Sequence, residues 1–500
     1  MPARALSVGD ILAFPLDHGW SACQVLQVAS KRVEVVSLDH WSAERPTLAA
    51  VTLRPLIIDH HFWKASLHHL NVSGPPPESF AVLGAAPVLN APKPCNSYGG
   101  WTALPLQADL QLRWNAVPAA ARAAFVAARD ARSSVTLRLP SGEMTLAAGL
   151  SKIALEFGVR RDSAALHIER AADFDLGALD VLPVLLSVSV TGDAPGLLDW
   201  LRTRPLVEKL SWRGALPPRI DLRGTGLREC TLDADGAHEV VVPDTLEGLA
   251  LTPSAAARWD VQARDDGALL ALRLPYTCDG DGVAHVTGLR RARSLTLSGV
   301  GALDLRALAG LYHPRDLCVH GAPGELRGSD ALAAFDALET LAFWRCLAVD
   351  AAHMPLLSQW PHLRRVDVVE ALDAETAALK AAWGRDKRVS VRSPRDAAWA
   401  RHHGSQPFRQ WRDERKRADV GAAFASASKK LDAAGSDAPA VAKVMQGFVK
   451  GLTRAHTKGA GFTAAEVADI EAAWATLLAR TAAVDGATAA AWLARGRKGW

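Results

Sequence analysis

The sequence predicts an α/β protein whose centre is a solenoid of repeated strand units. A short strand motif returns at a nearly constant interval through the middle of the chain, β-rich runs precede it and helical patterns follow it. The chain has 500 residues, more than one hydrophobic core usually supports. We therefore expect a small β-rich domain over residues 1–90, a linker and N-terminal cap over 91–159, a solenoid of about 11 units over 160–394, and an α-helical C-terminal domain over 395–500.

The N-terminal region reads as short consecutive strands. Residues 10–16, 23–29 and 32–38 are rich in β-branched and aliphatic residues, and the turn sequence Asp17-His18-Gly19 separates the first two runs. Strands this short and close together suggest a small, strongly bent antiparallel barrel. The proline-rich residues 86–94 read as a linker.

The repeats of the middle region are defined by their first inward apolar residue. Neighbouring members of this series are 19 to 25 residues apart in all ten intervals. One repeat cannot bury its own apolar edge, so we expect the strands to stack as a parallel sheet along a right-handed solenoid. The series is Leu166, Val188, Leu210, Cys230, Leu249, Leu272, Leu295, Leu317, Leu341, Val366 and Val389.

A period of this length with one strand per unit resembles the leucine-rich-repeat family. The sequence departs from that family at the position where an asparagine side chain usually forms hydrogen bonds with the backbone of the turn. Other groups must therefore form those hydrogen bonds here. Helical patterns at residues 331–338 and 373–383 predict convex-side helices, whereas residues 238–243 predict a second strand in narrower repeats. The positions that lack the asparagine are Ala215, Val300, Ala322, Cys346 and Ala371.

The C-terminal region is predicted to be helical and to cap the solenoid. Thr463 and Glu466 form a capping-box pattern ahead of an apolar stripe. A preceding helix carries a stripe of Val441, Met445, Phe448 and Leu452, and a junction helix is expected over residues 408–420. Solenoids need such a terminal cap to cover the last apolar face.

Composition excludes several classes of protein. The net charge of +4 argues against a nucleic-acid partner, and no apolar run is long enough to span a membrane. No secretory signal opens the chain, so a cytoplasmic location is expected. The cysteines stand singly, which argues against disulfides and zinc sites: Cys23, Cys95, Cys230, Cys278, Cys318 and Cys346.

No readable catalytic motif is present, and we expect a protein without enzymatic activity, cofactor, metal or small-molecule substrate. The pairs His60-His61 and His68-His69 beside Asp59 could suggest a metal cluster, but adjacent histidines on a strand point to opposite faces. Residues 385–419 contain 11 Lys and Arg against 5 Asp and Glu. This cluster could meet an acidic partner or a phosphate backbone, or be a solvated junction helix, which we favour because acids interrupt it.

The outward residues of the repeated strands are the candidate binding surface. An outward tryptophan beside charged residues is typical of interface hot spots, and we expect Trp344 to lie near the energetic centre of a protein-binding row. The alternative is that Trp344 packs on the loop of a neighbouring repeat. The predicted partner-binding residues are Arg213, Arg273, His320, Trp344, Asp367 and Arg392.

Two N-terminal segments, VGDILAFPLDHGWSACQVLQV from Val8 and GPPPESFAVLG from Gly74, resemble bacterial immunity family twenty-six of polymorphic-toxin systems. The resemblance covers about residues 7–88 and implies a cytoplasmic protein that neutralises a toxin or effector by binding it, with no catalytic residues. The solenoid and the later helices depart from such single-domain proteins. The segment PFRQW from Pro407 and the later helices resemble large bacterial leucine-rich-repeat proteins that are loosely labelled as motility-related, which leaves a scaffold or adaptor in signalling or motility as the alternative function.

Overall fold

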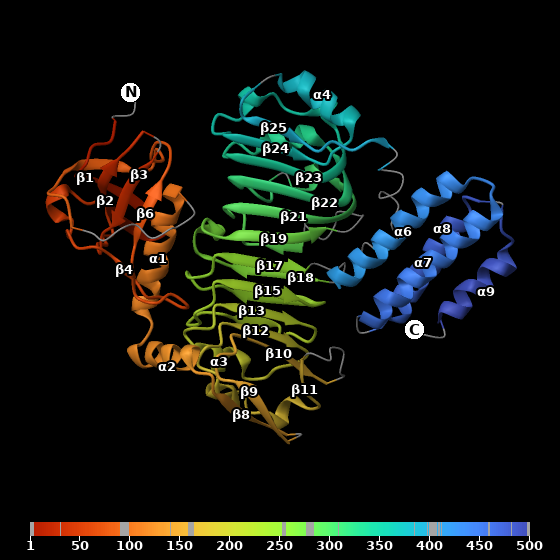
Figure 1. Cartoon of the computed structure of the whole chain (residues 1–500), viewed down its shortest axis with the longest axis horizontal. Helices are drawn as coiled ribbons and strands as arrows, with labels where there is room; N and C mark the ends of the chain where they lie inside the picture. The colour runs from red at the N-terminus through yellow and green to blue at the C-terminus, as the bar shows by residue number, and fades with distance from the viewer. Residues whose placement is uncertain are drawn as a thin grey trace. The chain divides into compact units, whose positions relative to one another are not determined.

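The computed structural model describes residues 5–497, except 31, 91–99, 141, 159–164, 253–256, 277–284, 309, 385, 398, 400–407, 409–410, 412, 459–460 and 482. It is a mixed α/β protein with a large parallel sheet (Figure 1). The chain divides into two compact units. The N-terminal unit comprises residues 1–136, 145–150 and 180–184, and the C-terminal unit comprises 137–144, 151–179 and 185–500.

The N-terminal unit is built on a five-stranded antiparallel sheet with the order β6-β3-β2-β1-β7. The three predicted strands are confirmed as β1, β2 and β3. The turn between β1 and β2 ends at Gly19, whose φ of +142° favours glycine and where a Cβ would lie 2.6 Å from the carbonyl oxygen of Ser42. The strands are β1 (Asp10–Leu16), β2 (Gly19–Val28), β3 (Val33–Ser37), β6 (His69–Val72) and β7 (Ala81–Ala85), with β4 (Ile57–Ile58) paired to β5 (Ser66–Leu67) in a separate sheet.

Two helices complete the N-terminal unit. Helix α1 (Ala103–Ala116) packs Leu104 and Ala108 into the sheet's apolar core, and the indole of Trp101 just before it donates to the carbonyl oxygen of Gly74 at 3.1 Å. Helix α2 (Ala119–Asp130) follows directly. The predicted boundary at residue 90 is therefore wrong: the segment expected to be a linker and solenoid cap supplies helices to the core of the strand domain, because the sheet needs an apolar layer on that face.

The C-terminal unit contains a 12-stranded parallel sheet in which the strands from β12 onward stack in chain order, like the rungs seen in Figure 1. The chain enters this sheet at β10 (Lys152–Phe157) and leaves it at β25 (Val389–Arg392). The other strands are β11 (Leu166–Ile168), β12 (Ser187–Thr191), β13 (Lys209–Arg213), β15 (Glu229–Asp233), β17 (Gly248–Thr252), β19 (Ala271–Tyr276), β21 (Ser294–Asp304), β22 (Asp316–Arg327), β23 (Thr340–Val349) and β24 (Arg365–Val369).

The register of this sheet confirms the predicted series from Val188 to Val389. Each member of the series pairs with the next across the sheet, and all of them from Val188 to Val366 are buried. Leu166 is a buried residue on a strand of the same sheet, but its predicted place next to Val188 is wrong. Its strand β11 pairs with Leu155 of β10, while β10 also pairs with β12, so β10 separates Leu166 from Val188.

The narrower repeats carry a second strand, as predicted for residues 238–243. The chain alternates between the large sheet and a four-stranded parallel sheet, β14 (Arg219–Asp221), β16 (Ala237–Val241), β18 (Arg258–Gln262) and β20 (Val286–Thr287). Other repeats have short helices: α3 (Leu197–Arg202) and the predicted α4 (Asp373–Trp383). The α-helix expected over residues 331–338 is wrong, since only the tighter 3-10 helix η8 (Ser329–Ala334) forms there.

Buried aromatic side chains tie neighbouring repeats together. Trp212, Trp360 and Trp383 each donate the indole N–H to a backbone carbonyl of the preceding repeat and so satisfy that carbonyl. These bonds run from the indole of Trp212 to Gly192 (2.9 Å), of Trp360 to Leu332 (3.0 Å) and of Trp383 to Pro355 (3.0 Å).

The described part of the chain after the last strand contains the helices α6 (Glu414–Ala434), α7 (Ala438–Lys458), α8 (Ala464–Leu478) and α9 (Gly486–Arg497). The predicted capping box at Thr463 and the buried stripe of α7 are confirmed. The helix expected from residue 408 begins only at Glu414, because the Asp413 carboxylate accepts the backbone N–H of Lys416 and so acts as the N-cap. Within the described ranges, no helix has the length and hydropathy needed to span a bilayer.

Candidate functional site

The outward residues of the 12-stranded sheet change in character along the sheet. In the row that later contains Trp344, the early strands hold Thr191, Arg213, Asp233 and Thr252. Large aromatic side chains enter at β22 and β23, where His320 and Trp344 lie side by side in register. The candidate site is therefore at the β22–β25 end of the sheet.

Trp344 is held between two of the predicted residues. The ring of His320 stacks on it with centroids 6.4 Å apart and an interplanar angle of 21°, and the guanidinium carbon of Arg392 lies 6.0 Å from its ring centroid. Trp344 is nevertheless 39% exposed, so its outer surface remains open to solvent. A large aromatic side chain held in one orientation at low entropic cost is typical of interface hot spots.

Asp367 has a different role from the predicted one. It is only 5% exposed and aligns with Ala342 rather than with Trp344, so the expectation of an exposed contact residue is wrong. Its carboxylate pairs with Arg365 at 2.5 Å and with Arg392 at 3.4 Å. A buried carboxylate between two arginines restrains them, and here it holds Arg392 near the face of Trp344.

The residue after Trp344 begins a charged ladder that the sequence analysis missed. Arg345 and Glu370 occupy equivalent turns of successive repeats with φ of +57° and +59°. Arg345 Nε donates to Glu370 Oε2 at 2.9 Å, and Arg395 binds the other oxygen of the same carboxylate. The early repeats place Gly192 and Gly214 at this turn.

A residue other than glycine is strained by about 1–3 kcal/mol in this left-handed backbone conformation. Arg345 and Glu370 therefore occupy these turns in spite of backbone strain. Burial favours a higher pKa for Glu370, but the hydrogen bonds from Arg395 and Arg345 outweigh it and lower the pKa below the usual value. Glu370 is therefore ionised at neutral pH. The replacement of the glycine by charged residues was the only signal in the sequence that could have revealed this ladder.

The side chains of His320, Cys318 and Cys346 are held in their uncharged forms. Burial, followed by the neighbouring Arg345, lowers the pKa of His320, which favours a neutral imidazole against Trp344. Burial raises the pKa of Cys318 and raises that of Cys346 to about 12. The Cys346 thiol donates to the carbonyl oxygen of Val319 at 3.4 Å, so it satisfies backbone in place of the missing asparagine.

Arg213 and Arg273 lie outside this cluster. Both are exposed on the same face of the sheet. Arg213 is on β13, six strands from β23, which is about 29 Å at about 4.8 Å per strand. Arg273 is on β19, three strands or about 14 Å away. The structure thus brings together four of the six predicted residues, one of them buried.

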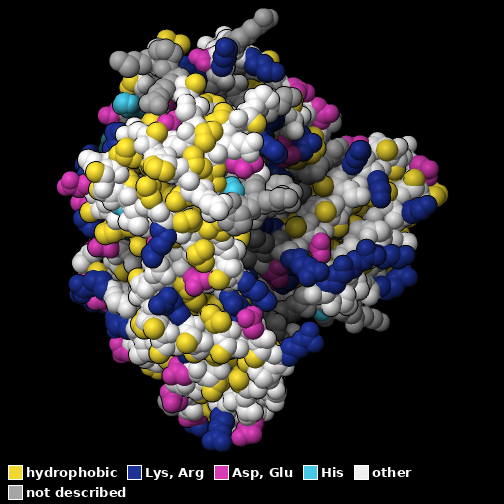
Figure 2. Space-filling model, turned by 60° about the vertical axis from the view of Figure 1, so that its left-hand side comes forward, with side chains coloured by type: hydrophobic (Ala, Val, Ile, Leu, Met, Phe, Trp, Pro, Cys, Tyr) yellow, Lys and Arg dark blue, Asp and Glu magenta, His cyan; other side chains and the backbone are white. Residues whose placement is uncertain are grey.

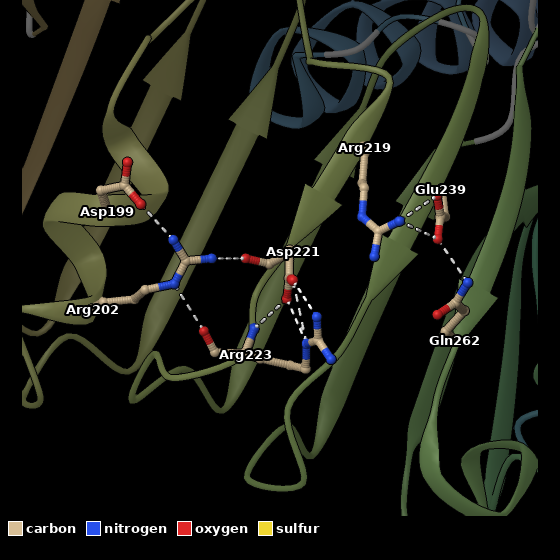
Figure 3. Close-up of polar contacts among 7 residues, drawn as sticks. All are labelled: Asp199, Arg202, Arg219, Asp221, Arg223, Glu239 and Gln262. Atoms are coloured by element: carbon tan, nitrogen blue, oxygen red, sulfur yellow. Dashed lines mark hydrogen bonds and ion pairs between the residues drawn. The ribbon is translucent and has the colours of Figure 1, made fainter.

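A second group of charged residues lies on helix α3 and on the narrower repeats that follow it (Figure 3). Arg202 donates to the backbone oxygens of Asp221 and Arg223 at 2.7 and 3.0 Å, and Arg219 pairs with Glu239 at 3.2 Å. These contacts join one repeat to the next. The acids and arginines balance within the group, so its chemistry is that of a staple between repeats rather than of a binding site.

The histidine pairs are part of the N-terminal core. His60, His68 and His69 are each 3% exposed; His60 Nε2 lies 2.8 Å from Gln107 Oε1 and His68 Nδ1 lies 2.7 Å from Ser37 Oγ. In the part of the chain that the structure describes, no His, Cys, Asp and Glu side chains gather as a metal site. Cys95 and Cys278 lie outside the described residues.

The basic cluster of residues 385–419 is only partly described. Arg388 forms a bidentate pair with Asp386. The buried Lys416 ammonium donates to Glu466 Oε2 at 3.0 Å and to the carbonyl oxygen of Gly461 at 2.6 Å. These charges are used within the fold.

Compared with known proteins, the chain matches no protein-family model, and no curated protein sequence matches it.

Proposed function

We propose that this chain is a non-enzymatic protein-binding protein that holds its partner against Trp344, His320 and Arg392. The observation that carries this proposal is the exposed Trp344, fixed in place by a stacked histidine and an arginine on a rigid sheet. Because its neighbours are already ordered, binding a partner would lose little conformational entropy there.

The fold that supports this role is a leucine-rich-repeat solenoid with a barrel-like N-terminal domain and a helical C-terminal cap. The in-register stacking of one apolar position across the repeats supports the solenoid. The antiparallel sheet of short strands that are close in sequence supports the N-terminal assignment. A stack of parallel strands presents its outward side chains in straight rows, which suits the recognition of an extended protein surface.

Immunity against a bacterial toxin in the cytoplasm is the specific role that we favour, and it rests on the N-terminal resemblance to immunity family twenty-six. A scaffold or adaptor in signalling or motility is the second candidate, and the repeats favour it. Both roles need the same kind of surface. A toxin gene next to this one would favour immunity, and the purified toxin would then be the partner to test.

The test compares Trp344→Ala with Trp41→Ala. Both tryptophans are partly exposed, at 39% and 50%, but Trp41 belongs to the N-terminal unit. Desolvating Trp344 in a complex is worth about 2 kcal/mol or more, so its truncation should weaken binding at least about thirtyfold. The dissociation constant for the toxin is measured by calorimetry, and the melting temperature is followed in parallel.

The expected result is weaker binding for Trp344→Ala with a nearly unchanged melting temperature, and unchanged binding for Trp41→Ala. In cells, the intact protein should restore growth when the toxin is co-expressed, and Trp344→Ala should not. A stable Trp344→Ala protein that binds and protects normally would refute this site. An intact protein that protects against no neighbouring gene product would favour the scaffold role.

A further inference from the structure

Helix α7 carries basic residues and no acidic ones. Between Ala438 and Lys458 its charged side chains are Lys443, Lys450, Arg454 and Lys458, and the helix contains no Asp or Glu. All four are exposed. Surface helices usually mix both signs of charge, because like charges one turn apart repel each other. We call these four residues the α7 basic stripe.

The stripe lies on the side of α7 that faces away from its core. Val441, Met445 and Leu452 point into the helical core, and at 3.6 residues per turn Lys443, Lys450 and Arg454 fall on the opposite side. Lys443 and Lys458 are 15 positions apart, or about 22 Å at about 1.5 Å per residue. In Figure 2, Lys and Arg side chains gather in a row over the helical part of the chain.

Two other basic residues of this helical region are neutralised by a carboxylate, whereas the stripe is not. Lys416 binds Glu466, and Arg480 binds Asp432. In the part of the chain that the structure describes, Lys443, Lys450, Arg454 and Lys458 have no ion pair. Lys458 lies in the last turn, where the helix dipole favours a cation, but the fold does not offset the repulsion along the rest of the row, and an external anion would relieve it.

We propose that the α7 basic stripe binds an acidic helix of a partner protein. Lys450, Arg454 and Lys458 follow one another at intervals of four residues, about 6 Å, and carboxylates on a second helix at the same interval would meet them one to one. The described residues of α6–α9 include no large exposed hydrophobic side chain. Single-stranded nucleic acid requires stacking aromatics and a membrane surface requires apolar anchors, so both fit this surface less well.

Contacts between exposed charges are individually weak and are screened within about 10 Å at 0.1 M salt. The stripe should therefore act mainly by speeding the encounter with the partner and by orienting it. This inference concerns a surface separate from the Trp344 site, and it stands whether or not that site binds a toxin.

The test uses the full-length protein and a labelled synthetic helical peptide with glutamate at every fourth position and alanine between. Binding is measured by fluorescence anisotropy at low salt. Lys450→Glu/Arg454→Glu should weaken binding at least about tenfold, because each substitution replaces an attraction with a repulsion. Lys64→Glu/Lys380→Glu changes the net charge equally at exposed lysines elsewhere, and should bind like the unaltered protein.

A peptide with glutamine in place of glutamate, a DNA duplex and anionic phospholipid vesicles complete the comparison. We expect the glutamate peptide to bind more tightly than all three, and increased salt to weaken its binding. Equal weakening by the two double variants would overturn the proposal, since net charge alone would then explain the binding. Tighter binding of the duplex or of the vesicles, lost in Lys450→Glu/Arg454→Glu, would overturn it in favour of a nucleic acid or a membrane.

Discussion

Acidification should destabilise the N-terminal unit through His68. This side chain is 3% exposed, and its Nδ1 lies 2.7 Å from the hydroxyl of the fully buried Ser37. Its backbone N–H donates to Leu56 O at 3.0 Å and its carbonyl oxygen accepts from the N–H of Ser37 at 2.9 Å, so its backbone is fixed on both sides. Burial, with a smaller contribution from His60, lowers the pKa of His68 from 6.5 to about 4.

The sign and size of the effect follow from this pKa. Between pH 6.5 and pH 4 the unfolded chain binds a proton at His68 and the folded chain does not, so the free energy of unfolding falls as the pH falls. A shift from 6.5 to about 4 corresponds to a loss of about 2 kcal/mol between pH 7 and pH 5, and about 3 kcal/mol by pH 4. That is a large share of the stability of a typical domain.

The assay compares the unaltered protein with His68→Gln. Samples are equilibrated in urea at pH 7 and at pH 5, then pulse-labelled by hydrogen exchange at one fixed pH, and peptides from β3 and β6 report the unfolded fraction of this sheet. His18→Gln, at an exposed position, is the control and should keep the full pH effect. His68→Gln should lower the free energy of unfolding at pH 7. Between pH 7 and pH 5, this variant should lose less free energy of unfolding than the unaltered protein. If its loss between pH 7 and pH 5 equals that of the unaltered protein, the reasoning is refuted.

Two further predictions concern the repeats. Trp360→Phe removes the hydrogen bond to the Leu332 carbonyl, leaves that oxygen buried without its partner, and opens a cavity. Urea denaturation should show that the free energy of unfolding falls by about 2–4 kcal/mol. A fall below about 1 kcal/mol would mean that this hydrogen bond is unimportant. Gly192→Ala places a Cβ 2.6 Å from the Phe157 carbonyl oxygen, whereas Gly196→Ala, also at positive φ, meets nothing within 4 Å. Gly192→Ala should lower the free energy of unfolding by about 2 kcal/mol or more, and Gly196→Ala by about 1 kcal/mol. Equal melting temperatures of the two variants would show that the predicted clash at Gly192 does not occur.

The sequence determined the parts of this protein that depend on local periodicity. An apolar residue returning every 19 to 25 residues predicted both the strands and their register from Val188 to Val389, because parallel strands that each bury the same position can stack in only one alignment. The alternation of inward and outward residues likewise placed Trp344 on the exposed face beside His320. The capping box at Thr463 was readable because all of its partners lie within one helical turn.

Only the tertiary structure decided which segments meet across long stretches of chain. Nothing local distinguishes Leu166, which lies at the edge of the sheet, from the strands that stack in order, because β10 pairs with both of its neighbours. Asp367 occupies an outward position in the alternating pattern of its strand. It is nevertheless buried, because arginines from its own strand and from the next repeat enclose it. The same is true of Glu370, whose two arginine partners come from repeats on either side. Ion pairs between residues about 25 positions apart depend on the exact placement of neighbouring turns, and a sequence pattern of one residue per repeat does not contain that information.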